Sequence, residues 1–244
     1  MTKRIGLLVL VLVTALAGCG GGGSSSALPI PNNNDKLSGA YIVTLGTSTG
    51  MSFYMVLNGR GTMTQVGVPS PLNPPGTYNV TTSDNFSITI TNPLDGNIIL
   101  TGALTSLQTF SFTARQGANN WGTGTIEKVT NLAECSDTWT GTLVEDGSVG
   151  GRTHTLTSVF TDTTGAITGG SITLQAGIPE SVYDRGLFCT STKMAGLLVT
   201  NAPETAYQMI MIWGDYNAGP SKSISNGQFE SDGNEFGTLT FTGL

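Results

Sequence analysis

Histidine, cysteine and charged side chains are all scarce in this chain, and each scarcity limits what the protein can do. Lys and Arg together number 10 and Asp and Glu number 16, so that 11% of residues are charged and the formal net charge is −6. An acidic chain without a basic run does not suit nucleic acid, because neutralising its phosphates requires Lys and Arg. Imidazole chemistry must use the one histidine, His154. Gly (34 residues), Thr and Ser are abundant instead, which is typical of a folded, turn-rich, all-β protein.

Long apolar runs are missing as well, apart from one near the start. Lys3 and Arg4 precede an apolar run from Ile5 to Ala17. A transmembrane helix needs roughly 18 or more apolar residues, so this run fits a secretory leader instead. It ends in Leu16-Ala17-Gly18-Cys19. An apolar residue, two small residues and a cysteine resemble the lipobox of bacterial lipoproteins.

The resemblance to lipoproteins implies where the protein resides. Residues 1–18 would be removed as a signal peptide, and Cys19 would carry a diacylglyceryl thioether and an acylated amine. Two or more acyl chains anchor a protein stably to a membrane. Residues 19–36 would then form a flexible, Gly/Ser-rich tether. In this family, Asp after the lipidated Cys favours the inner membrane. Gly20 stands there, so we expect a lipid anchor in the outer membrane of a bacterial envelope.

Two cysteines remain once Cys19 is assigned to lipid. An even pair in a secreted chain predicts a disulfide between Cys135 and Cys189. A bond closing so long a loop would stabilise the fold by roughly 4 kcal/mol on the chain-entropy model. The alternative is that both cysteines bind a metal, but the sequence supplies no CxxC or HxxxH spacing to complete such a site.

Strict alternation of apolar and polar residues dominates the rest of the chain. It is clearest in residues 86–91 and 109–114 and around Leu239 and Phe241. Each pattern predicts a strand with one face in a core and the other in water. Two-residue turn signals separate such segments: Asn58-Gly59, Asp95-Gly96, Asp146-Gly147, Asn226-Gly227 and Asp232-Gly233. Short strands joined by hairpins indicate antiparallel up-and-down meanders.

An internal repeat divides the body into two related halves. Residues 119–126 (NNWGTGTI) parallel residues 234–241 (NEFGTLTF), and Trp139-Thr140-Gly141 echoes Leu37-Ser38-Gly39. We therefore expect one β domain over 37–130 and a second over 131–244. The pattern of an early glycine and a closing aromatic-Gly-Thr strand resembles the calycin group of lipocalin-like and avidin-like barrels. A β-sandwich fits the same pattern, whereas a porin-like barrel would need longer apolar alternation.

Two features could carry catalysis. His154 shares strand parity with Leu156 and Phe160, which predicts that it faces a core or a barrel mouth, in either a structural or a catalytic role. Residues 46–50 (GTSTG) match the G-x-S-x-G nucleophile elbow. That motif requires a following helix, and here it falls between two predicted strands, so we interpret it as a turn.

Acidic residues form the remaining groups with chemical potential. Glu145 and Asp146 fall at one predicted hairpin tip, and Glu230, Asp232 and Glu235 at another. The second group has the oxygen ligands that Ca²⁺ uses but not the spacing of a known loop. No catalytic residue, metal site or cofactor is predicted.

One segment is apolar on both strand faces. Tyr207, Met209, Met211 and Trp213 lie on one face of a predicted strand, and Ile210 and Ile212 lie on the other. Such a strand belongs between layers or at a contact between the two halves. A Met-rich face beside aromatics could also line an apolar ligand pocket, so these four residues are the candidate ligand-binding set.

These observations predict a membrane-anchored envelope lipoprotein that is not an enzyme. It would act as a binding or structural module, with a small apolar ligand or a neighbouring envelope protein as its partner. A hydrolase acting on envelope polymers, or a surface adhesin, is the alternative.

Overall fold

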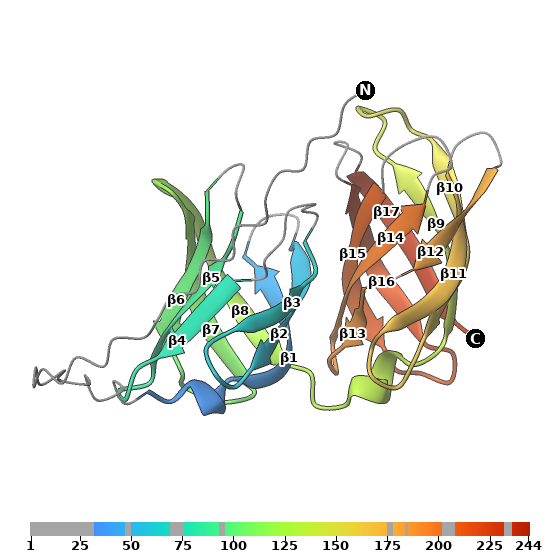
Figure 1. Cartoon of the computed structure of the whole chain (residues 1–244). Helices are drawn as coiled ribbons and strands as arrows, with labels where there is room; N and C mark the ends of the chain where they lie inside the picture. Colours follow the sequence, from blue (N-terminus) through green and yellow to red (C-terminus); the bar gives the residue numbers. More distant parts are fainter. Residues whose placement is uncertain are drawn as a thin grey trace, which may run out of the picture. The chain divides into compact units, whose positions relative to one another are not determined.

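The protein is all-β and consists of two antiparallel up-and-down sheets, each curled into a barrel or near-barrel (Figure 1). The computed structural model describes residues 32–46, 50–68, 76–92, 96–174, 178–183, 185–201, 208–231 and 236–244. Residues 31–244 form one compact unit. The helices of the described residues are two short 3₁₀ turns, η1 (Asn34–Lys36) and η2 (Leu132–Cys135). Neither is long and apolar enough to cross a membrane.

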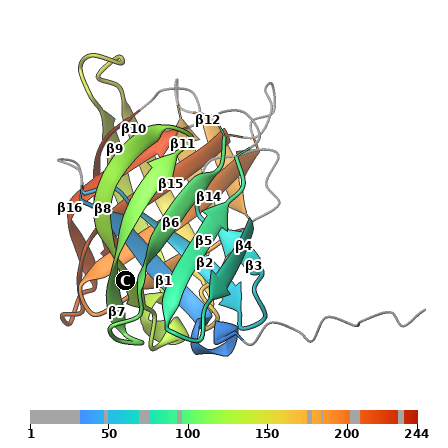
Figure 2. The ribbon, with the colours of Figure 1, turned by 90° about the vertical axis from the view of Figure 1, so that its left-hand side faces the viewer.

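The first barrel is a ring of eight strands in which the last returns to the first. In sheet order, β8 lies beside β1 on one side and β7, β6, β5 and β4 follow, as Figure 2 shows. Among the described residues, one isolated bridge, Thr62 to Thr77, joins the β3 and β4 edges of this ring. The strands are β1 (Ser38–Leu45), β2 (Ser52–Asn58), β3 (Met63–Val66), β4 (Gly76–Val80), β5 (Asn85–Ile90), β6 (Ile98–Ala103), β7 (Thr109–Gln116) and β8 (Asn119–Lys128).

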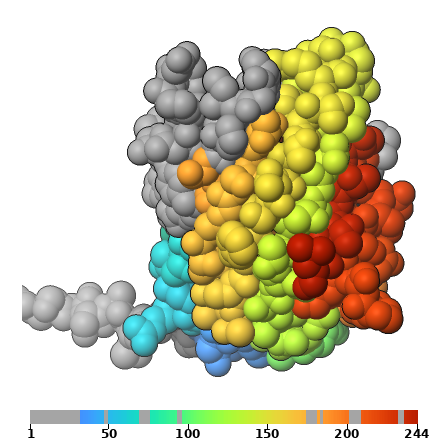
Figure 3. Space-filling model, turned by 90° about the vertical axis from the view of Figure 1, so that its right-hand side faces the viewer, coloured from blue at the N-terminus to red at the C-terminus, as the bar shows by residue number. Residues whose placement is uncertain are grey.

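The second barrel closes more completely. Its last strand pairs with its first, and a further pairing of β12 with β14 joins the opposite side of the ring. The short strand β13 pairs with β14 as an extra member. The outer faces of β10 and β11 lie side by side in Figure 3. The strands are β9 (Thr138–Glu145), β10 (Thr153–Thr161), β11 (Ile167–Leu174), β12 (Ile178–Tyr183), β13 (Leu187–Cys189), β14 (Lys193–Asn201), β15 (Gln208–Asn217), β16 (Ser223–Ser231) and β17 (Phe236–Gly243).

The predicted alternation is present in the cores. In β7, Phe110 and Phe112 are buried while the intervening Ser111 is exposed, so one face of this strand lines the interior. Phe110 packs edge-on against Phe86, with 5.1 Å between ring centroids. In the second barrel, Trp139 stacks on Phe241 at 4.9 Å. Aromatic pairs of this geometry add to the stabilisation from buried area.

Bulges overturn two details of the predicted pattern. A register irregularity between Leu156 and Val159 shifts the parity of β10, so Phe160 points outward and is 46% exposed, contrary to the prediction. The predicted hairpin at Asn226-Gly227 is also wrong, because β16 continues through both residues. Asn226 has φ of 50° there and belongs to a bulge, since Asn tolerates the left-handed region.

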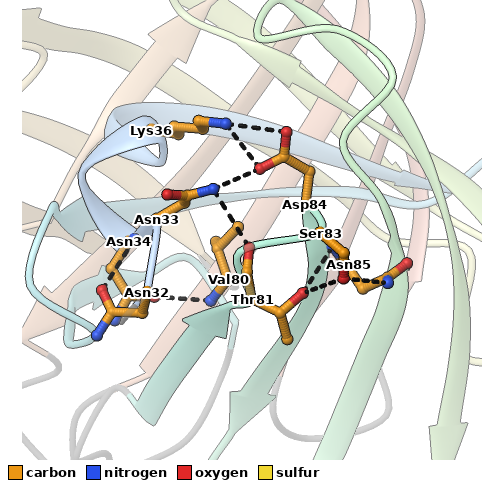
Figure 4. Close-up of polar contacts among 9 residues, drawn as sticks. All are labelled: Asn32, Asn33, Asn34, Lys36, Val80, Thr81, Ser83, Asp84 and Asn85. Carbon is orange, nitrogen blue, oxygen red and sulfur yellow. Dashed lines mark hydrogen bonds and ion pairs between the residues drawn. The ribbon is translucent and has the colours of Figure 1, made fainter. Parts of the chain in front are cut away.

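A 3₁₀ turn precedes the first strand of each barrel, and different interactions attach it to the rest of the barrel in the two cases. In the first barrel, Oδ1 of Asn34 accepts a hydrogen bond from the Val80 backbone N–H at 2.7 Å. Nearby, Asn33 and Lys36 donate to the Asp84 carboxylate, as Figure 4 shows. In the second barrel, the predicted disulfide is confirmed.

The disulfide joins Cys135 of η2 to Cys189 of β13, with 5.4 Å between the Cα atoms. Trp139 donates its Nε1–H to the Cys135 carbonyl at 2.9 Å. The η2 turn is therefore held covalently and by a buried hydrogen bond.

Strands β14 and β15 bury both faces because they belong to two cores. Ile210 points into the second barrel, while Leu197 and Met211 point outward and pack in one cluster with residues of β1 and β2. Tyr54 of β2 lies 4.7 Å from Phe188 of β13, measured between ring centroids. The doubly apolar strand thus lies at a contact between the two halves, one of the two placements that its sequence predicted.

Candidate functional site

A groove of about 460 Å³ lies on the outer face of β15, β16 and β17. Cross-strand pairing builds its floor from two adjacent rows. Trp213, Gln228 and Thr238 form one row, and Glu230 and Phe236 belong to the next. Gln228 and Glu230 alternate with Phe229, which belongs to the core of the second barrel, so both polar side chains face away from that core.

Two loops contribute further side chains to the lining of the groove. Met51 comes from the connection between β1 and β2, and Asp146 comes from the β9–β10 hairpin. Gly237, also in the lining, has no room for a side chain, because a Cβ there would collide with the Val144 carbonyl. The groove therefore combines residues from both barrels.

Trp213 is the member of the lining whose hydrogen bonding is incomplete. It is 5% exposed, and its buried Nε1–H has no hydrogen-bond acceptor among the described residues. Trp139, the buried tryptophan of the second core, has such an acceptor. Leaving a buried donor without a partner costs about 1–3 kcal/mol, so the Trp213 N–H, unpaired within the described residues, is an unfavourable feature beside the groove.

The charges of the groove are negative. Asp146 and Glu230 are acidic, and no Lys, Arg or His is among the described residues that line the groove. Glu230 stands between Met211 and Phe236 in the sheet, and desolvation by neighbouring protein raises its pKa although part of the side chain is exposed. Hydrogen bonds from the hydroxyl and backbone of Ser148 lower the pKa of Asp146.

The predicted ligand-binding set is divided by the structure. Trp213 lines the groove, whereas Met209 and Met211 are 6% and 2% exposed and pack in the contact with the first barrel. Tyr207 lies outside the described residues. The ligand-binding role of the set stays a prediction, and Trp213 is its member at the groove.

Glu145, which directly precedes Asp146 of the groove in the chain, belongs to a polar cluster with Arg152 and His154. Nε2 of His154 is 2.7 Å from Oε1 of Glu145, and Arg152 donates from Nε to Oε2 at 2.9 Å. His154 and Glu145 are 1% and 3% exposed. Burial acts to raise the pKa of Glu145, but the hydrogen bonds from Arg152 and His154 outweigh it and lower the pKa. This group is a buried contact between His154 and the Glu145 carboxylate, and the partly exposed Arg152 forms an ion pair with the same carboxylate.

A second cavity, of about 390 Å³, includes Gly39, Val56 and Thr64 from the first barrel and Thr164 and Phe188 from the second. Its lining carries no ionisable side chain among the described residues. The groove at Trp213 therefore has the richer chemistry of the two.

The other predicted motifs contribute little chemistry. Residues 47–49 of the G-x-S-x-G match lie outside the described residues, and its flanking glycines follow β1 and precede β2. Asp232 and Glu235 also lie outside the described residues, as does Cys19. Within the described part of the chain, no three His, Cys, Asp or Glu side chains come together as metal ligands.

The groove was not recognisable as a unit from the sequence. Glu230 belongs to an acidic group in the sequence, and Phe236 and Thr238 belong to the repeat at residues 234–241, whereas no sequence pattern singles out Gln228 and Met51. Their proximity depends on the cross-strand register, which a single sequence does not specify. The alternation of polar residues with Phe229 in β16 was the one local signal.

The chain matches no family model, no curated protein and no solved structure.

Proposed function

We propose that this protein is a lipid-anchored protein of the bacterial envelope that binds a small organic ligand in the groove at Trp213. It acts as a binding module and not as an enzyme. Attachment through Cys19 is supported by the lipobox residues 16–19, and the Gly/Ser-rich segment that follows suits a tether. Gly20 supports sorting to the outer membrane.

The observation that carries the ligand-binding role is the N–H of Trp213, which has no acceptor among the described residues and lies beside a groove of about 460 Å³. Ligand sites typically combine apolar walls with a few placed polar groups, and their volumes are about 300–1,000 Å³. Trp213, Phe236 and Met51 supply the apolar walls, and Gln228 and Glu230 supply polar groups. A ligand that accepts a hydrogen bond would complete the indole N–H.

Native mass spectrometry tests the ligand. The full chain is produced in a bacterium, extracted in detergent and measured before and after denaturation. We expect a noncovalent organic species on the native protein that is lost on denaturation, and a lower occupancy in Trp213→Phe, which removes the N–H. Full-occupancy binding by the variant would refute the placement of the site. An empty native protein would refute the ligand-binding role.

Radiolabelled palmitate and fractionation test the anchor. We expect Cys19→Ser to lose the label and leave the membrane fraction, whereas Cys135→Ser keeps both because its thiol is not the lipidated one. We expect Gly20→Asp to move the protein to the inner membrane. Labelling of Cys19→Ser equal to that of the unmodified chain would overturn the anchor.

A further inference from the structure

We infer that the ligand of the groove is an uncharged saccharide, an inference that rests on the proposed function and specifies its ligand class. The groove offers hydrogen-bond donors and acceptors together. Trp213 has a buried N–H donor with no acceptor in the described part of the chain. The Asp146 and Glu230 carboxylates only accept when ionised, and Gln228 does both. A hydroxyl group both donates and accepts, so a ligand carrying several hydroxyls satisfies all of these groups at once.

The same polar groups argue against a purely apolar ligand. A hydrocarbon in the groove would leave the Trp213 N–H unpaired and would remove water from the carboxylates of Asp146 and Glu230. Both effects are unfavourable, because buried donors and charges without partners lose free energy. The saccharide is therefore an alternative to the apolar ligand that the sequence predicts, and the apolar ligand stays a prediction.

The charges argue against anionic ligands. Asp146 and Glu230 repel phosphates, sulfates and uronates, and no cationic side chain among the described lining residues offsets them. An organic cation would be attracted, but an ammonium group only donates hydrogen bonds and cannot accept one from Trp213. An uncharged sugar carries no negative charge, and its hydroxyls can accept a hydrogen bond from Trp213.

The exposed ring of Phe236 supplies an aromatic surface on which a sugar ring can pack. It is 46% exposed in a row next to Trp213 and diagonal to it across β16. The C–H face of a pyranose ring is apolar and can pack on an aromatic face while its hydroxyls point to polar neighbours. Phe236 would hold one ring of the sugar, and Glu230, Gln228 and Trp213 would contact its hydroxyls.

The test is isothermal titration calorimetry on the full chain in detergent. The probes are an N-acetylglucosamine trimer and maltotriose as neutral sugars, a galacturonic acid trimer as the anion, and spermine as the cation. We expect at least one neutral trimer to bind at least 10-fold more tightly than either charged probe. Spermine binding more tightly than both neutral trimers, or equal binding of the uronate, would overturn the inference.

Matched variants locate the binding. We expect Phe236→Ala to weaken the neutral sugar at least 5-fold, while Phe160→Ala leaves it unchanged, since both rings are 46% exposed but Phe160 lies on β10 away from the groove. Asp146→Asn should weaken it, and Asp162→Asn should not, although each aspartate accepts a backbone hydrogen bond within a similar hairpin turn. Equal effects of a variant and its matched control would overturn the placement.

Failure of the saccharide inference can be distinguished from failure of the proposed ligand-binding function. A co-purified ligand in native mass spectrometry, combined with no binding of either neutral trimer, would refute the saccharide and keep the proposed function. An empty native protein that binds none of the four probes would refute both.

Discussion

The two barrels share one plan but are closed by different means. Each begins with a 3₁₀ turn, and in each the last strand returns to pair with the first. In the first barrel, Asn34 accepts a hydrogen bond from Val80, and Asn33 and Lys36 donate to Asp84. One isolated bridge, Thr62 to Thr77, joins the β3 and β4 sides within the described residues. In the second, the turn is latched by the disulfide, and β12 pairs with β14. Polar contacts and a covalent bond therefore perform the same task.

The interiors of the two barrels also differ, in the polar side chains that they bury. Among the described residues, the buried polar side chains of the first barrel are the uncharged Asn34 and Ser52, whereas the second barrel encloses the Glu145 carboxylate and His154. Burying charges is unfavourable unless they are paired, so a single substitution can lower the free energy of unfolding more in the second barrel than in the first. The comparison predicts that the second barrel depends on a few specific bonds and the first on distributed packing.

The largest expected effect comes from removing the disulfide. Cys135→Ser with Cys189→Ser should lower the free energy of unfolding of the second barrel by about 4 kcal/mol, because the bond restricts the unfolded chain across 54 residues. Urea denaturation followed by tryptophan fluorescence measures it. Reductant should shift the unmodified protein by a similar amount and leave the double variant unchanged. Insensitivity of the unmodified protein to reductant would contradict the prediction.

The next effect comes from the buried contact between His154 and Glu145. His154→Ala should lower the free energy of unfolding by about 3 kcal/mol, because Glu145 loses a partner inside the barrel. Lys193→Ala, which breaks the partly exposed pair with Asp215, is the control and should cost about 1 kcal/mol or less. Urea denaturation of both variants checks the prediction, and equal losses would show that His154 is not needed to compensate a buried charge.

A smaller effect is expected at the hydrogen bonds that hold the 3₁₀ turn of the first barrel. Asn34→Ala should lower the free energy of unfolding by about 1–2 kcal/mol, because the Val80 N–H loses its acceptor in a buried site. Asn85→Ala removes an exposed hydrogen bond in the same region and should change stability by about 0.5 kcal/mol or less. Thermal unfolding monitored by circular dichroism compares the two. A loss at Asn34 as large as that of the disulfide variant would remove the contrast between the barrels.

The smallest effect is a difference in acid sensitivity. The pKa of Glu145 is lowered in the folded protein, so its contribution to stability is present above the unfolded value near 4.5 and is lost as the pH falls through the folded pKa. Denaturation midpoints measured from pH 7 down to pH 3 should therefore fall less steeply in Glu145→Gln than in the unmodified chain. Asp84→Asn tests the first barrel in the same way, because a hydrogen bond from Lys36 lowers the pKa of Asp84. Parallel slopes for Glu145→Gln and the unmodified chain would contradict the assignment.

Local signals in the sequence were sufficient for the strands and the disulfide. The alternation in residues 109–114 predicted β7, and the pairing of Cys135 with Cys189 followed from their being the two cysteines left in the body. The apolar character of both faces around Ile210 and Met211 predicted a buried strand because that pattern is local. Tandem duplication stays a prediction, although β8 and β17 hold equivalent places in their rings.

Features that depend on register could not be read from the sequence. The outward turn of Phe160 follows from a bulge in β10, and the conversion of Asn226 from a turn to a bulge follows from its pairing with β17. The groove requires Trp213, Gln228 and Thr238 to be level across three strands. A shift of one residue would send each side chain to the opposite face, so the site is a property of the pairing and not of any segment.

The contact between the barrels has a consequence for how the chain acquires its fold as it emerges from a ribosome or an export channel. The first barrel can close as soon as β8 is available, because β8 pairs with β1. Its β1–β2 outer face then stays uncovered until β14 and β15 follow, since these strands bury it in the finished protein. During that interval the nascent chain presents an apolar surface to water, which is the kind of surface that chaperones bind and that promotes aggregation. Slow delivery of the second half would therefore be more harmful to this protein than slow delivery of the first.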